Sequence, residues 1–395
     1  MPGFGGAISD PEINALVAFI REQRTQQGRL PAAAPRAPKS AAVSSEAHAF
    51  RVETVADGLR EPWSIAWLPD GRMLVTEKTG TLRIVENGDA KTAVRGIPSV
   101  NSSGQGGLLE VALHPDYAKN GWIYLAFTPA VKNAKGESVS MTKLVRGRIR
   151  DGAWVDEEPI WSAPLETQRR AGGVHFGCRI AFDGKGYLYF SHGERGARDH
   201  AQDIKRPNGK IHRIHDDGRI PADNPFVKEP DAIPSIWSYG NRNPQGLDFD
   251  PRTGVLWSTE HGPRGGDELN IIKKGANYGW PVITYGINYN GTTITRETAR
   301  PGMEQPVVHW TPSIAVCGVD FYEGDAFPKW KGNLFVAALA HKELRRVVIE
   351  NDRVAHQEVL LKGTARIRDV ASGPDGLLYV VLNDPGKIIR LTPAQ

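Results

Sequence analysis

The sequence is poor in the residues that define several common classes of protein. Its 395 residues include only two cysteines, Cys178 and Cys317. Two cysteines are too few for a disulfide framework and lack the paired spacing of a zinc site, so we expect two buried thiols. A Cys-x-x-Cys-His sequence, which attaches haem c, is absent as well.

Long apolar runs and blocks of like charge are also missing. No apolar segment approaches the ~20 residues that span a bilayer, and residues 1–25 lack the apolar stretch of a signal peptide, so no membrane-spanning segment is predicted. With 49 basic and 45 acidic side chains the formal net charge is only +4, and no long Lys/Arg block occurs. A nucleic-acid partner is therefore not expected.

Glycine and proline, by contrast, are abundant. The chain contains 43 glycines and 28 prolines, and 40% of its residues are apolar. A chain of this length can bury a large core, and so many turn-forming residues favour an all-β protein.

Two segments precede the β-rich part. Residues 1–24 are predicted to contain a helix, because Ser9 and Glu12 form a capping box and apolar residues then recur on one face. Residues 25–47, rich in Ala, Pro, Arg and Ser, have the composition of an extended linker. The rest of the chain, residues 48–395, is expected to form one domain.

Within that domain one short unit recurs, a turn that leads into an apolar strand. The copies lie at residues 69–77, 115–127, 183–191, 251–259, 327–338 and 374–382. Six copies predict a six-bladed β-propeller with four-stranded antiparallel blades. Residues 387–391 read as a strand of the last blade, which residues 50–55 would complete. Because the spacing is unequal, a β-sandwich or a parallel β-helix remains the alternative.

Irregular loops rich in Gly and Pro at residues 238–247, 260–270 and 277–281 indicate a binding site. Gly262 and Pro263 are candidate carbonyl ligands for a hard cation, with acidic side chains close by in the sequence. Gly-Pro turns are common, and the Asp-rich loop of an EF-hand is absent, so this signal is weak when taken alone.

His175 lies between glycines just before the third repeat. A neutral imidazole there is a candidate general base, and it needs a carboxylate such as Glu194 to fix its tautomer. The alternative is a hydrogen-bonded histidine in an ordinary loop.

Arginines form the other candidate group. Arg366 and Arg368 share one face of a strand if the alternation holds, and with Arg242 they would place three positive charges at one locus. The alternative is a set of surface ion pairs with Asp369 or Asp375.

Taken in order, these motifs resemble one family across residues 50–393. The matching segments are 104–109, 114–117, 175–179, 240–246, 261–263, 267–268, 277–281 and 366–369. They resemble the soluble aldose sugar dehydrogenases that use pyrroloquinoline quinone (PQQ), which are six-bladed propellers and act outside the cytoplasm. The resemblance therefore implies a periplasmic or secreted enzyme.

The resemblance also implies a reaction and its catalytic residues. His175 removes the proton of the sugar's C1 hydroxyl while hydride passes from C1 to C5 of the quinone, giving a lactone. Glu194 falls at the acidic partner of that histidine, and Arg242 contacts the reacting quinone oxygen. Electrons then leave to an external acceptor, a cytochrome or an artificial dye.

Cofactor and metal ligands follow from the same matching. Gln105 and Asn243 contact PQQ, and Arg366 and Arg368 bind its carboxylates. The main-chain oxygens of Gly262 and Pro263 bind a catalytic Ca²⁺ that polarises the quinone, while Glu268 and the carbonyl of Tyr278 bind a second, structural ion. Two positions depart from the pattern. Ala340 or His341 stands where a cofactor-binding lysine is expected, and whether Lys342 replaces that lysine is left open; Val174 occupies a place that is acidic in some members.

The segment before the β domain has a resemblance of its own. Residues 1–4, 9–13 and 16–20 resemble the end of a c-type cytochrome domain, in which a methionine ligates haem. The expectation is that haem c belongs to a domain upstream of this sequence, and a stray amphipathic helix is the alternative.

Two other functions stay open on this fold. A metal-dependent lactonase or related hydrolase would need carboxylate and Asn ligands that converge on the propeller axis, and it would work without quinone. A non-catalytic propeller that binds protein or sugar would need neither the base at His175 nor the arginines.

Overall fold

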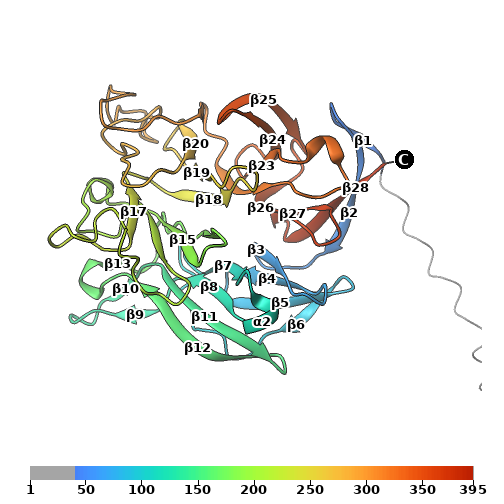
Figure 1. Cartoon of the computed structure of the whole chain (residues 1–395), viewed down its shortest axis with the longest axis horizontal. Coiled ribbons are helices and arrows are strands. Elements are labelled where there is room, and N and C mark those ends of the chain that lie inside the picture. The colour runs from blue at the N-terminus through green and yellow to red at the C-terminus, as the bar shows by residue number, and fades with distance from the viewer. Residues whose placement is uncertain (1–40, 395) are drawn as a thin grey trace, which may run out of the picture. The chain divides into compact units, whose positions relative to one another are not determined.

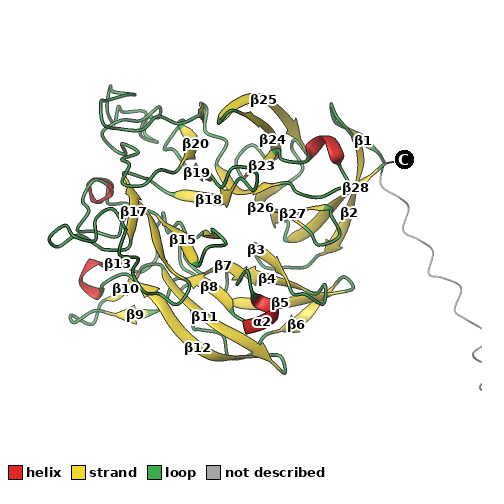
Figure 2. Ribbon diagram, viewed as in Figure 1, coloured by secondary structure: helices red, strands yellow, loops and turns green. Residues whose placement is uncertain are grey.

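The computed structural model describes residues 41–394, so the predicted helix at 9–24 and most of the predicted linker lie outside the described residues. Strands dominate the described range (Figure 2), which confirms the all-β prediction. Its helical elements are α2 (Tyr117–Asn120), η1 (Leu165–Thr167), η2 (Arg198–Ala201) and η3 (Pro328–Trp330). Within residues 41–394 no helix has the length and apolarity needed to cross a membrane.

Antiparallel sheets of four or five strands follow one another along the chain, as predicted. Sheet 1 has β3 (Pro62–Trp67), β4 (Met73–Glu77), β5 (Thr81–Glu86) and β6 (Asp89–Ala93). Sheet 2 has β7 (Leu108–Leu113), β8 (Ile123–Phe127), β11 (Lys143–Arg150) and β12 (Ala153–Ser162). Sheet 3 has β14 (Ile180–Phe182), β15 (Tyr187–His192), β16 (Lys210–His215) and β17 (Ile236–Tyr239). Sheet 4 has β18 (Pro244–Phe249), β19 (Leu256–Glu260), β20 (Asp267–Ile271) and β21 (Val308–Trp310); sheet 5 has β22 (Val316–Phe321), β23 (Leu334–Ala338), β24 (Glu343–Glu350) and β25 (Arg353–Leu360).

Sheet 6 combines the two ends of the described chain. It has β26 (Arg366–Ser372), β27 (Leu378–Asp384), β28 (Lys387–Pro393), β2 (Ala49–Ala56) and β1 (Val43–Ser44). β2 pairs with β28 from Phe50↔Pro393 to Ala56↔Ile388, which confirms the predicted pairing of residues 50–55 beside 387–391. A small separate sheet contains β9 (Val131–Lys132), β10 (Ser138–Ser140) and β13 (Arg169–Arg170).

The recurring unit read from the sequence marks the same element in every sheet. Each copy ends in the second strand: β4, β8, β15, β19, β23 or β27. These strands are buried at nearly every position, and on both of their faces. In β27, Leu378, Val380 and Leu382 pack into one cluster, while Tyr379 and Val381 pack into another on the opposite face.

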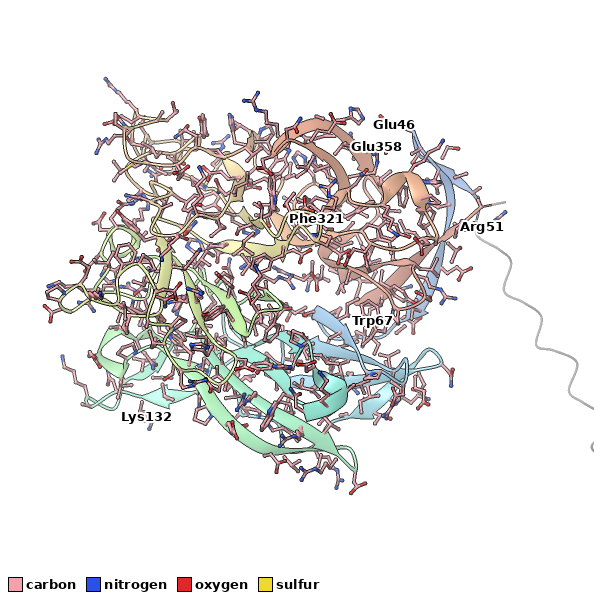
Figure 3. All side chains as sticks on the ribbon, viewed as in Figure 1. Glu46, Arg51, Trp67, Lys132, Phe321 and Glu358 are labelled. Carbon is pink, nitrogen blue, oxygen red and sulfur yellow. The ribbon has the colours of Figure 1, made fainter. Side chains whose placement is uncertain are left out.

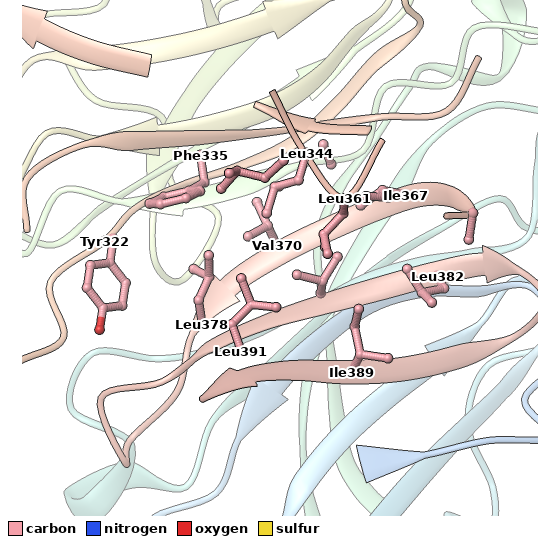
Figure 4. Close-up of a cluster of buried hydrophobic side chains, with 14 of the residues drawn as sticks. Tyr322, Phe335, Leu344, Leu361, Ile367, Val370, Leu378, Leu382, Ile389 and Leu391 are labelled. Atoms are coloured by element: carbon pink, nitrogen blue, oxygen red, sulfur yellow. The ribbon is translucent and has the colours of Figure 1, made fainter. Parts of the chain in front are cut away.

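The sheets are held together by one hydrophobic cluster between each sheet and the next. The cluster between sheets 5 and 6, drawn in Figure 4, includes Tyr322, Phe335 and Leu391. Another cluster joins sheet 6 back to sheet 1, through residues such as Val381 and Val75. The first strands of the sheets also contact one another in a closed sequence, β3–β7–β14–β18–β22–β26–β3. Figure 1 shows inner strands such as β3, β7 and β18 near the middle and β6, β12 and β25 at the periphery.

The start of the described chain is fastened to sheet 5 as well as sheet 6. The Glu46 N–H donates to Glu358 Oε1 at 2.7 Å, and the Glu46 carboxylate lies 3.2 Å from Arg346 and 2.7 Å from His356. Figure 3 shows Glu46 and Glu358 side by side. Part of the segment predicted as linker is therefore packed against the sheets.

Candidate functional site

The main cavity, of about 830 Å³, opens where the first strands of the sheets begin and the second strands end. Its wall includes four predicted cofactor-binding residues: Gln105, Asn243, Arg366 and Arg368. Arg366 and Arg368 begin β26, whereas Gln105 and Asn243 lie in the loops that lead into β7 and β18. The four residues meet because all of them stand at the same end of the inner strands. This end of the ring of strands is the candidate active site.

His175 is held next to the cavity by two hydrogen bonds, one of them to the lining residue Gln105. Its backbone N–H donates to Gln105 Oε1 at 2.8 Å, and its Nδ1 donates to Glu194 Oε1 at 2.5 Å. The Glu194 N–H in turn donates to the Arg242 carbonyl at 2.9 Å. The predicted histidine–carboxylate pair is therefore present, and it leaves Nε2 of the imidazole as the basic nitrogen.

The surroundings keep this imidazole neutral. Burial lowers the pKa of His175, the hydrogen bond to Glu194 opposes that effect, and the positive charge of Arg242 lowers the pKa further. A neutral imidazole at neutral pH is the form that accepts a proton.

Glycines let the loops of this wall approach closely. Gly104 has a φ of 62°, and a Cβ there would lie 2.3 Å from the Gly173 carbonyl oxygen. The Gln105 N–H donates to that same carbonyl at 2.9 Å. The loop before β7 is thus fixed to the loop that carries His175.

The two arginines of β26 differ in how they are held. Arg368 Nη1 donates to Gln245 Oε1 and to Cys317 Sγ, both at 3.0 Å, whereas Arg366 has one long contact of 3.5 Å with the Leu339 carbonyl. Neither pairs with Asp369 or Asp375, the alternative open from the sequence, since these pair with Arg179 and Arg390. Both cysteines are buried and free, as predicted.

A buried ion cluster lies beneath the cavity. Arg179 Nη1 is 2.8 Å from Glu110 and its Nη2 is 3.0 Å from Asp369. The same guanidinium donates to the carbonyls of Gln245 at 2.7 Å and Arg368 at 3.1 Å. Burial raises the pKa of Glu110 to about 7 in spite of the arginine. Arg179 therefore ties together strands that carry cavity residues.

The remaining predicted residues gather around a second, nearly filled space next to the cavity. Its volume is about 10 Å³, and it is lined by Arg242, Gly262, Pro263, Glu268 and Tyr278 among others. Arg242 Nη1 donates to the Gly262 carbonyl at 2.7 Å. The two groups of predicted residues thus adjoin, because His261 lines both spaces.

Two carboxylates are buried beside this second space. Burial raises the pKa of Glu260 to about 7, and burial together with the charge of Glu260 raises that of Glu268 to about 8. Asp267 is differently placed, because both its oxygens accept hydrogen bonds, from Gly262 N–H at 2.8 Å and Val316 N–H at 3.1 Å. No group of three or more His, Cys, Asp or Glu within residues 41–394 is arranged to hold a metal ion.

Sequence reasoning missed some residues of the wall and left the role of one residue open. Trp63 and Lys78 line the cavity, whereas Lys342, considered for the missing lysine, is absent from the lining, where Ala340 stands. A signal for Lys78 was available, because Thr76-Glu77-Lys78 ends the second strand of sheet 1 as Thr259-Glu260-His261 ends that of sheet 4.

A family model described as Glucose / Sorbosone dehydrogenase matches residues 59–390. The chain belongs to the glucose/sorbosone dehydrogenase family. This membership confirms the resemblance read from the motifs. Within the family, the chain is similar to aldose sugar dehydrogenase YliI from Escherichia coli strain K12, with 42% identity over 350 residues that cover 87% of this chain and 92% of the relative.

Solved structures of this glucose/sorbosone dehydrogenase family agree with the fold. The apo form of the soluble aldose sugar dehydrogenase from Escherichia coli matches with a TM-score of 0.81 and 40% identity, over 87% of this chain and 100% of that one. The PQQ-bound form of an aldose sugar dehydrogenase from Streptomyces coelicolor matches with a TM-score of 0.71 and 29% identity, over 89% and 99% of the two chains. The family membership makes this chain an oxidoreductase.

Proposed function

We propose that the protein oxidises aldose sugars at the C1 hydroxyl to lactones with PQQ and Ca²⁺, and passes the electrons to an external acceptor. The observation that carries this proposal is the histidine–carboxylate pair of His175 and Glu194 beside a cavity that bears Arg366 and Arg368. Two findings support the choice of cofactor: the chain belongs to the glucose/sorbosone dehydrogenase family, and a structurally similar aldose sugar dehydrogenase is known in a PQQ-bound form.

The proposal includes the propeller architecture. The six larger sheets would be the blades, since their first strands contact in a closed sequence and a hydrophobic cluster fills each interface between successive sheets. Such a ring places the candidate site on its axis, where loops from every blade converge.

The cavity suits PQQ in size and charge. A volume of about 830 Å³ is ample for a tricyclic acid, and Arg366 and Arg368 are forked donors that match carboxylates. Three nearby polar atoms are buried without a hydrogen-bond partner among the described residues: Arg368 Nε, His261 Nε2 and Arg242 Nε. Buried polar groups normally have partners, so a polar ligand would complete them.

Calcium fits the adjoining loop through carbonyl oxygens. Arg242 uses one lone pair of the Gly262 carbonyl, which leaves the other, and no described residue donates to the Pro263 carbonyl. A bound Ca²⁺ would act there as a Lewis acid on the quinone. A second ion held by Glu268 and the Tyr278 carbonyl would relieve the repulsion between Glu260 and Glu268.

The chemistry divides between cofactor and protein. When bound, the quinone accepts the hydride from C1 of the aldose and later gives its electrons to a cytochrome or dye. His175 takes the C1 hydroxyl proton on Nε2, because Nδ1 is committed to Glu194. Glu194 stabilises the imidazolium that forms, whereas the charge of Arg242 disfavours it. Arg242 would instead contact the reacting quinone oxygen, where negative charge develops. The hydrolase alternative has no observation of its own, since no group of three or more His, Cys, Asp or Glu among residues 41–394 is arranged to hold a metal ion, and the inner-strand carboxylates of Glu110 and Asp369 pair with Arg179.

Reconstitution tests the proposal. The purified chain freed of cofactor should reduce a dye with aldoses only after PQQ and Ca²⁺ are added. His175→Ala should bind PQQ normally yet turn over about 10²–10⁴-fold more slowly, the usual contribution of a general base. The matched control is His356→Ala, an exposed histidine on β25 outside the cavity lining. Full activity without PQQ, or full activity of His175→Ala, would overturn the proposal.

A further inference from the structure

The cavity lining contains one positively charged side chain that the sequence motifs did not identify. Lys78 follows the last residue of β4 and lines the cavity together with Arg366 and Arg368. We propose that Lys78 is a cofactor-binding residue that pairs with a carboxylate of PQQ. The inference rests on the proposed function and assigns a ligand to this side chain.

The backbone of Lys78 is fixed against the loop that carries Gln105. Its N–H donates to the Glu61 carbonyl and its carbonyl accepts from the Leu108 N–H, each at 3.1 Å. A Cβ on Gly107 would lie 2.0 Å from the Lys78 carbonyl oxygen and 2.7 Å from its Cγ. The stem of Lys78 therefore lies directly on Gly107, where only glycine leaves room for it.

The ammonium group of Lys78 has only weak partners among residues 41–394. Lys78 Nζ is 3.4 Å from Glu61 Oε2 and 3.3 Å from the Ser102 carbonyl. The Glu61 side chain is 51% exposed and that of Lys78 only 14%. An ion pair with one solvated partner contributes little, so the ammonium can leave Glu61 for an anion in the cavity at small cost.

The charge of the cofactor explains why a third cation is needed. PQQ carries three carboxylates, and Arg366 and Arg368 supply two of the positive side chains of the lining. On the side of sheet 5 the lining is apolar, through Leu339 and Ala340. Lys78 is the other positively charged side chain in the lining, and a lysine binds carboxylate as a mobile point charge without a fixed fork.

Equilibrium binding of PQQ to the cofactor-free chain tests the inference, read by quenching of protein fluorescence in Ca²⁺ buffer. Lys78→Met should weaken PQQ binding about tenfold, which corresponds to ~1.4 kcal/mol, and Lys78→Arg should retain most of the affinity. Glu61→Gln should tighten binding about two- to threefold, because it removes the competing carboxylate. The matched control is Lys119→Met, whose side chain is 79% exposed on α2.

The outcomes separate this inference from the proposed function. If the unsubstituted chain does not bind PQQ, both fall. If it binds PQQ and folded Lys78→Met binds equally well, only the role of Lys78 is overturned, and thermal melting of each cofactor-free variant shows whether it is folded. Should Lys78→Met fail to fold, unchanged affinity in Glu61→Gln overturns the role instead.

Discussion

His175 has a backbone φ of 59°, a left-handed conformation that non-glycine residues rarely adopt. The hydrogen bond from its N–H to the Gln105 side chain stabilises that conformation. Such strained residues gather at functional sites, where the surrounding structure holds them. Gln105 is thus placed to orient the imidazole from one side while Glu194 orients it from the other.

Replacing Glu194 by Gln should weaken the base without removing it. The carboxylate raises the pKa of His175 against the effect of burial, so its loss lowers that pKa further. The acid limb of the plot of kcat/KM against pH reports the pKa of His175, which lies below the ordinary histidine value of ~6.5. In Glu194→Gln this limb should move to lower pH. The rate on the plateau should fall about tenfold or more, since a weaker base transfers protons less readily.

The control for this change is Glu166→Gln, a carboxylate on η1 outside the cavity lining. The measurement is the pH profile of sugar oxidation by the reconstituted enzyme. A shift of the acid limb to higher pH would contradict the assignment of Glu194.

Sequence motifs identify catalytic and binding residues more readily than they identify the contacts that hold those residues in place. His175, Glu194 and the two arginines of β26 stand in recognisable motifs. The structure brings the arginines into the cavity lining and places His175 next to it, bonded to Gln105 and Glu194. The signal for Lys78 is only a Thr-Glu pair that also precedes His261, and its place in the site depends on the close approach of Gly107 from the next sheet. Contacts between segments far apart in the sequence leave little local trace.

The inner strands depend on the buried cluster around Arg179. This arginine stands just before β14, and its hydrogen bonds reach β7, β18 and β26. The guanidinium also lies 4.2 Å from the Trp63 ring, on β3. The recurring unit predicted one strand of each sheet, but it gave no indication that one arginine links its own sheet to four others, because its partners are distant in sequence.

Arg179→Lys should weaken cofactor binding as well as the fold. Lysine keeps the charge but cannot make the set of directed bonds that hold Gln245 and Arg368. We expect a fall in thermal midpoint and a loss of PQQ affinity of about tenfold, equivalent to ~1.4 kcal/mol.

Arg213→Lys provides the comparison. Arg213 is equally buried, pairs with Asp223 at 2.9 Å and lies 3.7 Å from the Tyr187 ring, outside the cavity lining. It should lower the thermal midpoint without changing PQQ affinity. Equal effects of both variants on PQQ binding would show that Arg179 acts only through general stability.

The whole molecule depends on the pairing of its first and last long strands. Sheet 6 is complete only when β2 joins β28, and the cluster between sheets 6 and 1 contains residues of both, such as Ala56 and Ile388. This closure was readable from the sequence, since the last repeat is followed by one strand too few for a four-stranded sheet. The arrangement of the apolar residues into separate clusters was not, because it depends on which sheets become neighbours.

Ending the chain at residue 386 should abolish folding. The truncation removes Ile388, Ile389 and Leu391, each nearly or fully buried. Loss of one such side chain costs about 2–5 kcal/mol, so three together are comparable with the whole stability of a domain, ~5–15 kcal/mol. Far-ultraviolet circular dichroism and sedimentation would show the loss, and a chain ending at Pro393 serves as control. A cooperative melt by the shorter chain would contradict this account of the closure.

The same pairing sets an order on biosynthesis. A ribosome makes Phe50 more than 300 residues before its partner Pro393, so the edge of β2 that pairs with β28 has no strand to pair with while the residues between them are made. Arg366, Arg368 and Asp384 of the cavity wall are also made more than 300 residues after Phe50. The cavity that we propose for PQQ is therefore complete only after β28 has been made, so loading of the cofactor would have to follow that step.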